Sequence, residues 1–157
     1  MANLIEHKRA HFDYEFLEHF EAGLQLFGTE VKSLREHRGK LEGAHITVRG
    51  GEAFLMNAEI PPYQAQNTVG KYDPTRNRKL LLTKKELTKL ASAEEKAGLT
   101  LVPLSMYNKG RVIKLRFVVA RGKKKGDKRQ AIKKREALRD IAREVKRGVE
   151  KISKHLR

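Results

Sequence analysis

Positive charge is concentrated in the C-terminal part of this 157-residue chain, and this asymmetry constrains the fold more than any other sequence feature. Residues 121–157 hold 16 Lys and Arg against five Asp and Glu, a net charge of +11, whereas residues 1–120 carry a net charge of +5. Like charges at this density repel one another and disfavour a compact state. The sequence therefore predicts a folded body, residues 1–120, followed by a basic tail, residues 121–157.

The overall composition indicates a polyanionic partner. The net charge is +16 and the pI about 10.2, which is typical of proteins that bind nucleic acid or an anionic membrane surface. The chain has no Cys, which excludes disulfides and thiolate metal sites and fits a reducing cytoplasm. The first residues, MANLIEHKRAHF, lack the apolar stretch of a secretory signal, and no apolar run approaches the roughly 20 residues of a transmembrane helix.

The body reads mainly as antiparallel β-structure. Residues 12–26 alternate between apolar and polar side chains, which predicts a long half-buried strand that bends near Gly23. Residues 44–60 read as two strands joined by a tight turn at Gly50 and Gly51, and residues 99–120 as two more, joined at NKG.

Two helices are expected between these strands. A short one is predicted after Thr29 as its N-cap, ending at Gly39. A clearer one follows Thr83, which forms a capping-box pattern with Glu86, and it stops at Gly98.

The tail contains an apolar stripe at helical spacing, with steps of three and four residues. Its members are Leu138, Ile141, Val145, Val149, Ile152 and Leu156. Such a helix could dock on the body, lie on a membrane, or stay unstructured alone and fold against RNA. The absence of Trp and Phe from the stripe disfavours the membrane, and the self-repulsion of the basic face favours folding against RNA.

Catalytic motifs are not apparent. His7 and His11 are four residues apart but lack an HExxH context, no Ser lies in a nucleophile-elbow sequence, and there is no GxxxxGK[ST] phosphate loop. We therefore expect neither an enzyme nor a bound metal or cofactor.

Candidate RNA contacts fall into three groups. Residues 121–129 hold six Lys and Arg in nine positions, which favours contact with phosphates over a merely solvated linker. Arg76, Arg78 and Lys79 are either ordinary surface or, beside exposed Tyr63 and Tyr72, part of an RNA platform. A third candidate, the carboxylate at position 21, either faces solvent or accepts hydrogen bonds from bases, because phosphates would repel it.

Three blocks, in order and spacing, resemble the family of small protein B, the SsrA-binding proteins of bacterial trans-translation. They are FEAGLQLFGTEVKSLR (20–35), YDPTRNRKLLLTKKEL (72–87) and ARGKKKGDKR (120–129). The resemblance implies a small closed β-barrel of oligonucleotide-binding type with flanking helices. It also implies an adaptor that, as a monomer, binds the tRNA-like domain of tmRNA and delivers it to stalled ribosomes, with a tail that is disordered when free and helical in the empty mRNA channel.

The same resemblance assigns roles to individual residues. Glu21 would read a base, Leu81 would support the RNA elbow, and Lys114 would contact a phosphate. The residues that would contact ribosomal RNA near the decoding centre are Arg121, Lys123, Lys124, Asp127, Lys128 and Arg129. One departure is Gly126, which stands where some members of the family have a side chain able to stack on a base.

The remaining alternatives are a general RNA chaperone or ribosomal protein, an RNA-modifying enzyme and a membrane-surface protein. The general RNA binder explains the charge but not the matches at Glu21 and RKLLL. The enzyme lacks a plausible nucleophile or cofactor loop.

Overall fold

The computed structural model describes residues 2–64, 71–123, 135–136 and 138–143. Its contacts divide the chain into two units, Met1–Gly122 and Lys123–Arg157.

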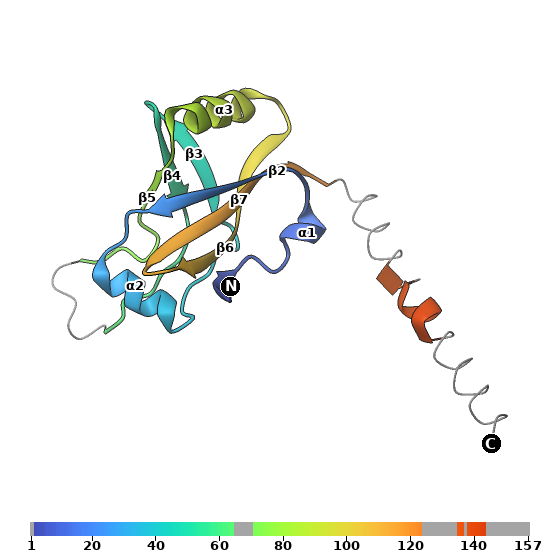
Figure 1. The fold of residues 1–157 in the computed structure, drawn as a ribbon, viewed down its shortest axis with the longest axis horizontal. Helices are drawn as coiled ribbons and strands as arrows, with labels where there is room; N and C mark the ends of the chain where they lie inside the picture. Colours follow the sequence, from blue (N-terminus) through green and yellow to red (C-terminus); the bar gives the residue numbers. More distant parts are fainter. Residues whose placement is uncertain (1, 65–70, 124–134, 137, 144–157) are drawn as a thin grey trace, which may run out of the picture. The chain divides into compact units, whose positions relative to one another are not determined.

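The first unit is built on a sheet of seven antiparallel strands, six of which close into a ring (β6, β3, β4, β5, β2 and β7), while β1 pairs with β6 alone (Figure 1). The strands follow one another in the order β1-β6-β3-β4-β5-β2-β7, and β7 returns to pair with β6. Their bounds are β1 Asn3–Glu6, β2 Tyr14–Leu24, β3 His45–Arg49, β4 Glu52–Met56, β5 Arg78–Leu81, β6 Leu99–Lys109 and β7 Val112–Gly122. The prediction of a mainly β fold with a closed ring of strands and flanking helices is confirmed.

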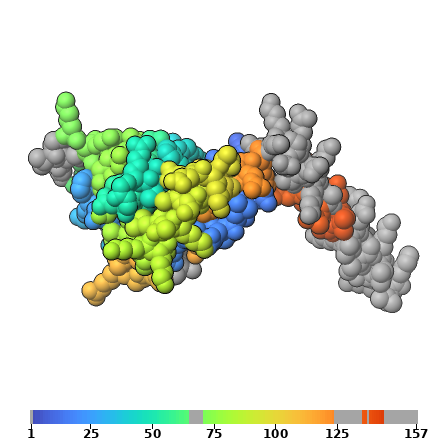
Figure 2. All heavy atoms as spheres, turned by 90° about the horizontal axis from the view of Figure 1, so that it is seen from above, coloured from blue at the N-terminus to red at the C-terminus, as the bar shows by residue number. Residues whose placement is uncertain are grey.

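Helices flank the ring, with α3 (Lys84–Glu95) at one end and α2 (Gly28–Arg35) at the other (Figure 1). Seen from above, α3 lies in yellow-green across its end of the body (Figure 2). The carboxylate of Glu94 fixes α3 to β3, since it accepts hydrogen bonds of 2.7 Å from both the Thr47 hydroxyl and the Val48 amide. The short helix α1 (Ala10–Asp13) precedes β2.

An aliphatic core fills the ring. Leu34 from α2, Leu90 from α3 and Leu55, Leu115 and Phe117 from the strands are fully buried in one cluster. Each such side chain contributes roughly 1.5–3 kcal/mol through the apolar surface that it removes from water. The core therefore forms without Trp, because many medium-sized apolar side chains together remove enough surface from water.

A bulge in β2 explains why apolar and polar side chains alternate over so many residues of this strand. Phe16 pairs with Ala120 and Glu18 with Val119, so Leu17 has no partner in β7. Tyr14 and Phe16 pack on a small second cluster with Ala10 and Ala120, whereas Phe20, Ala22 and Leu24 pack in the main core. One extra residue moves the even positions from one face of the sheet to the other. The single period-two pattern of β2 thus places apolar side chains in two separate clusters.

Local turn and cap signals are largely confirmed. Gly50 and Gly51 join β3 to β4 with φ values of 59° and 75°, as a tight hairpin requires. The Thr83 side chain accepts a hydrogen bond from the Glu86 amide, and the Glu86 carboxylate accepts one from Thr83 in return.

The predicted N-cap at Thr29 is wrong. Helix α2 starts at Gly28 and ends at Arg35, before Gly39, and the residue before it is Phe27. The Phe27 amide donates to the Glu30 carboxylate over 2.8 Å, so a carboxylate inside the first turn replaces the expected hydroxyl.

The second unit contains helical residues at 135–136 and 138–143. Leu138 and Ile141, the first two members of the apolar stripe, are both exposed. The other four members lie outside the described residues. Strand β7 runs two residues past the predicted boundary at residue 120, so Arg121 lies in a strand of the first unit.

Candidate nucleic-acid interface

Three strands meet at Gly23, and their side chains form a groove on the outside of the ring. Gly23 in β2 is paired with Leu81 in β5 on one side and with Lys114 in β7 on the other. A methyl group on Gly23 would lie 3.4 Å from the Leu81 side chain and 3.6 Å from the Lys114 Nζ. Because Gly23 has no side chain, the apolar Leu81 and the cationic Lys114 can approach each other across the floor of the groove.

The groove encloses about 610 Å³ and continues to the start of α3. Leu81 is 51% exposed, so it leaves an apolar surface of the groove open to a ligand. Lys79 also lines the groove and forms an exposed ion pair of 3.0 Å with Glu52. Lys84 adds a third lysine, so the groove combines an apolar patch with cationic edges.

Glu21 lies at the same groove, two residues before Gly23 on β2. Its carboxylate is exposed and forms an ion pair of 3.0 Å with the Lys109 ammonium. The neighbouring Tyr107 hydroxyl, followed by Lys109, lowers the pKa of Glu21 below its ordinary value. Glu21 is therefore an anion at neutral pH and can act only as a hydrogen-bond acceptor.

Arg78 is not part of this surface, and its assignment as an RNA contact is wrong. Its side chain is fully buried, and all five of its N–H groups are used within the protein. The Nε donates to Glu30 over 2.8 Å, and the two terminal nitrogens donate to the Tyr72 hydroxyl and to the carbonyl oxygens of Ala58, Pro74 and Arg76. No donor remains for a phosphate.

Glu30 is the centre of this buried cluster. Both Arg76 and Arg78 form ion pairs with its carboxylate, which is 1% exposed. Burial alone would raise the pKa of Glu30, but the two guanidinium groups and the Phe27 amide outweigh it and lower the pKa. These ion pairs thus join two sequence blocks. One is EVKSLR, which contains Glu30, and the other is PTRNRKLLL, which contains both arginines.

The aromatic platform expected beside these arginines is not present in the predicted form. Tyr72 is only partly exposed, and the single proton of its hydroxyl is shared between two acceptors, the Glu30 carboxylate at 2.9 Å and the Ile60 carbonyl at 2.8 Å. Arg76 stacks on the exposed ring of Phe27 at 3.9 Å. Tyr63 lies beneath the Lys32 ammonium at 5.5 Å from its ring centre. Glu30, which sequence reasoning overlooked, could have been suspected from its place between apolar neighbours in a short helix.

A family model described as SmpB protein matches residues 4–147, which include the groove, the buried cluster and part of the tail. The chain belongs to the SmpB family. Two similar relatives are both named SsrA-binding protein. The one from Microcystis aeruginosa is 48% identical over 92% of this chain and 94% of its own, and the one from Synechococcus sp. is 50% identical over 91% and 93%.

A solved structure supports the same assignment. It is described as "tmRNA-SmpB: a journey to the center of the bacterial ribosome", and one of its chains is 44% identical to this SmpB-family chain. The two superpose with a TM-score of 0.65, covering 81% of this chain and 92% of the other. The resemblance to the SsrA-binding family is therefore confirmed.

Arg121, another predicted contact of this SmpB-family chain, is separated from the groove. Arg121 is exposed near the end of β7, seven residues beyond Lys114, which corresponds to about 23 Å of strand. Lys123 follows it and is half-buried. Lys124, Asp127, Lys128 and Arg129, like Gly126, lie outside the described residues.

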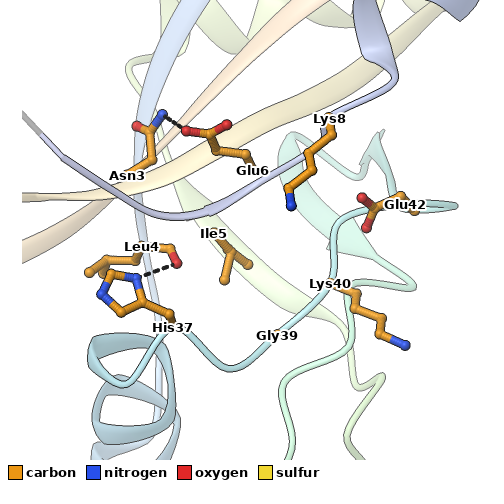
Figure 3. Close-up of a pocket in the computed structure, with 9 residues that line it drawn as sticks. All are labelled: Asn3, Leu4, Ile5, Glu6, Lys8, His37, Gly39, Lys40 and Glu42. Carbon is orange, nitrogen blue, oxygen red and sulfur yellow. Dashed lines mark hydrogen bonds between the residues drawn. The ribbon is translucent and has the colours of Figure 1, made fainter.

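A second hollow, of about 730 Å³, lies between β1 and the segment after α2 (Figure 3). Lys8 and Lys40 face it together with Glu6 and Glu42, so its charges balance. The His37 ring is hydrogen-bonded at 3.0 Å to the Leu4 carbonyl on the outer edge of β1. Among the residues that the structure describes, none of the predicted RNA contacts of this SmpB-family chain lines this hollow.

The described ranges contain neither a metal-binding cluster nor a membrane-spanning helix. No three His, Asp or Glu side chains gather there in a way that could hold a metal ion. No helix in those ranges has the length and hydropathy needed to cross a bilayer.

The Tyr72 hydroxyl provides a test of the buried cluster by pH. Burial, followed by the Glu30 carboxylate, raises its pKa from 10.0 to about 12. Because the neutral form is favoured in the folded state, its contribution to stability is present below pH 10 and is lost as the pH rises through 12. Absorbance of tyrosinate should show one of the four tyrosines titrating near pH 12, and Tyr72→Phe should remove that component. Ordinary titration of all four would contradict the cluster.

Proposed function

We propose that this chain is an RNA-binding adaptor that binds the tRNA-like domain of tmRNA and brings it to stalled ribosomes for trans-translation. Membership of the SmpB family and the naming of its relatives as SsrA-binding proteins support the proposal. The observation that carries it is the groove at Gly23, where Glu21, Leu81 and Lys114 come together from three separate strands.

Each side chain of the groove suits a different part of an RNA. The Glu21 carboxylate repels phosphates, so it accepts hydrogen bonds from base amino or imino groups and reads sequence or fold. Leu81 offers an exposed apolar surface on which an unstacked nucleotide can rest. Lys114 and Lys79 neutralise backbone phosphates, and this contribution weakens as salt is added.

The basic tail is assigned to the ribosome. Arg121 and Lys123, at the exit from the body, and Lys124, Asp127, Lys128 and Arg129 contact ribosomal RNA near the decoding centre and in the empty mRNA channel. On this proposal the tail takes up its full helical form only when it is bound, and residues 135–136 and 138–143 are already helical in the free chain. The exposure of Leu138 and Ile141 supports this assignment, because an apolar stripe needs a partner.

The adaptor requires binding rather than turnover, so we assign it no catalytic step and no cofactor. Its place is the cytoplasm, where ribosomes work, and one copy binds each tRNA-like domain.

The experiment that tests the proposal is a pull-down of total bacterial RNA at roughly physiological salt, followed by sequencing of the bound species. We expect one RNA with a tRNA-like end and an internal reading frame to dominate. RNA that mirrors the input would instead indicate a general basic RNA binder and overturn the proposal.

Replacing Glu21 tests the base-reading role directly. Glu21→Ala should weaken binding to the tRNA-like domain about tenfold, the scale of one specific base contact, with little loss of fold because the side chain is exposed. Glu15→Ala, at another exposed position on β2, is the matched control and should leave affinity within about twofold. An affinity of Glu21→Ala equal to that of the control would show that Glu21 reads no base.

A further inference from the structure

A buried hydroxyl lies close enough to Glu21 to lower the pKa of its carboxylate, although it makes no hydrogen bond of standard geometry with the described residues. Tyr107 in β6 is 1% exposed, and its hydroxyl makes no hydrogen bond of standard geometry within the described part of the chain. An unpaired buried polar group costs roughly 1–3 kcal/mol, so one that persists at a surface groove calls for a reason.

The strand register brings Tyr107 to the groove from two strands away. Tyr107 pairs with Lys114 in β7, and Lys114 pairs in turn with Gly23 in β2. Glu21 lies two residues before Gly23 and Lys109 two residues after Tyr107, so all of them project from the same face of the sheet.

The charges on this face surround the tyrosine. The ion pair between Glu21 and Lys109 connects β2 to β6 across β7. The Arg116 guanidinium, opposite Glu21 in the register, lies 5.0 Å from the centre of the Tyr107 ring. These cations, together with Lys114, are the charged neighbours of the carboxylate.

We infer that Tyr107 is a positioning residue, whose hydroxyl holds the Glu21 carboxylate towards an RNA base while Lys109 turns to a phosphate. In the free protein Lys109 holds the carboxylate. RNA phosphates compete for that ammonium, and a carboxylate left without any donor would be repelled from the interface. The adjacent Tyr107 hydroxyl, which already lowers the pKa of Glu21 in the free protein, then becomes the main donor to the carboxylate. The inference rests on the proposed function, because it takes Glu21 as the base-reading group.

The first test needs no RNA. The pKa of Glu21 is measured by carboxyl NMR in the full-length protein and in Tyr107→Phe. The hydroxyl is the largest cause that lowers this pKa, so the pKa should rise in the variant. Because the hydroxyl makes no standard hydrogen bond, its removal should leave the fold intact. An unchanged pKa would overturn the inference.

The second test is a double-mutant cycle with a labelled tRNA-like domain, read by fluorescence anisotropy. Tyr107→Phe should weaken binding about three- to tenfold when Glu21 is present and less than about twofold in the Glu21→Ala background. Tyr72→Phe is the matched control, because it also removes a tyrosine hydroxyl beside a carboxylate. It should lower the melting temperature but leave affinity within about twofold.

The outcomes separate the two ideas. Equal losses in both backgrounds, or no loss in either while Glu21→Ala weakens binding, would overturn the role of Tyr107 and leave the role of Glu21 standing. Full affinity in Glu21→Ala would overturn both, since Tyr107 would have no base-reading group to position.

Discussion

A chain that ends at Gly122 is expected to bind tmRNA with nearly unchanged affinity and to support no tagging of stalled translation products. The groove at Gly23 lies entirely in the first unit, which keeps its own core and all seven strands after the truncation. The tail carries most of the net positive charge, so its loss removes all of the contacts assigned to the ribosome except Arg121.

Two measurements check this expectation. Affinity for the tRNA-like domain is compared between the truncated and full-length proteins at several salt concentrations, and the tag is assayed on a reporter mRNA without a stop codon. The full-length protein with Lys128 and Arg129 changed to Gln is the control for charge alone and should show reduced, not abolished, tagging. Wild-type tagging by the truncated protein would show that the tail is not the channel probe.

Removal of Glu30 should produce a large loss of stability in the first unit, comparable to the loss of a buried core side chain. Glu30→Ala leaves Arg78 charged, fully buried and without its carboxylate, a situation that costs about 3–5 kcal/mol in other proteins. For a body of this size that corresponds to a fall of roughly 10–20 °C in melting temperature.

Glu36→Ala is the matched control, because Glu36 is exposed at the end of the same helix. It should change the free energy of unfolding by no more than about 0.5 kcal/mol. Urea unfolding followed by circular dichroism measures both variants. A loss below about 1 kcal/mol for Glu30→Ala would mean that the cluster is not what holds α2 to the ring.

The local turns and caps of this fold could be predicted from the sequence, whereas the partner of a buried charge could not. The double glycine at residues 50 and 51 and the Thr83 cap were predictable because each acts within a few residues. Arg78 was misassigned because its partner lies 48 residues away, and a charge in a sequence does not reveal whether it meets a phosphate or a buried carboxylate. The base-reading role of Glu21 came from the family resemblance and stays a prediction.

Two strands escaped prediction for physical reasons. β1 and β5 have only four residues each, too few for an alternation to stand out. β5 is further disguised by Arg78, a charged residue at an inward position. The bulge at Leu17 was also hidden, since both halves of β2 follow the same alternation although they face different cores.

The closure of the ring by its last strand has a consequence for the synthesis of the protein. Tyr14 in β2 pairs with Gly122 in β7, and β1 pairs with β6, so the first strands to be made wait for partners that are among the last. Pairings so distant along the chain make folding slow, because a long loop must close before any contact rewards it. A nascent chain interrupted before residue 112 lacks β7 and leaves the long edges of β2 and β6 without it. Such edges invite aggregation, so an incomplete copy of this protein is itself a product that a cell must clear.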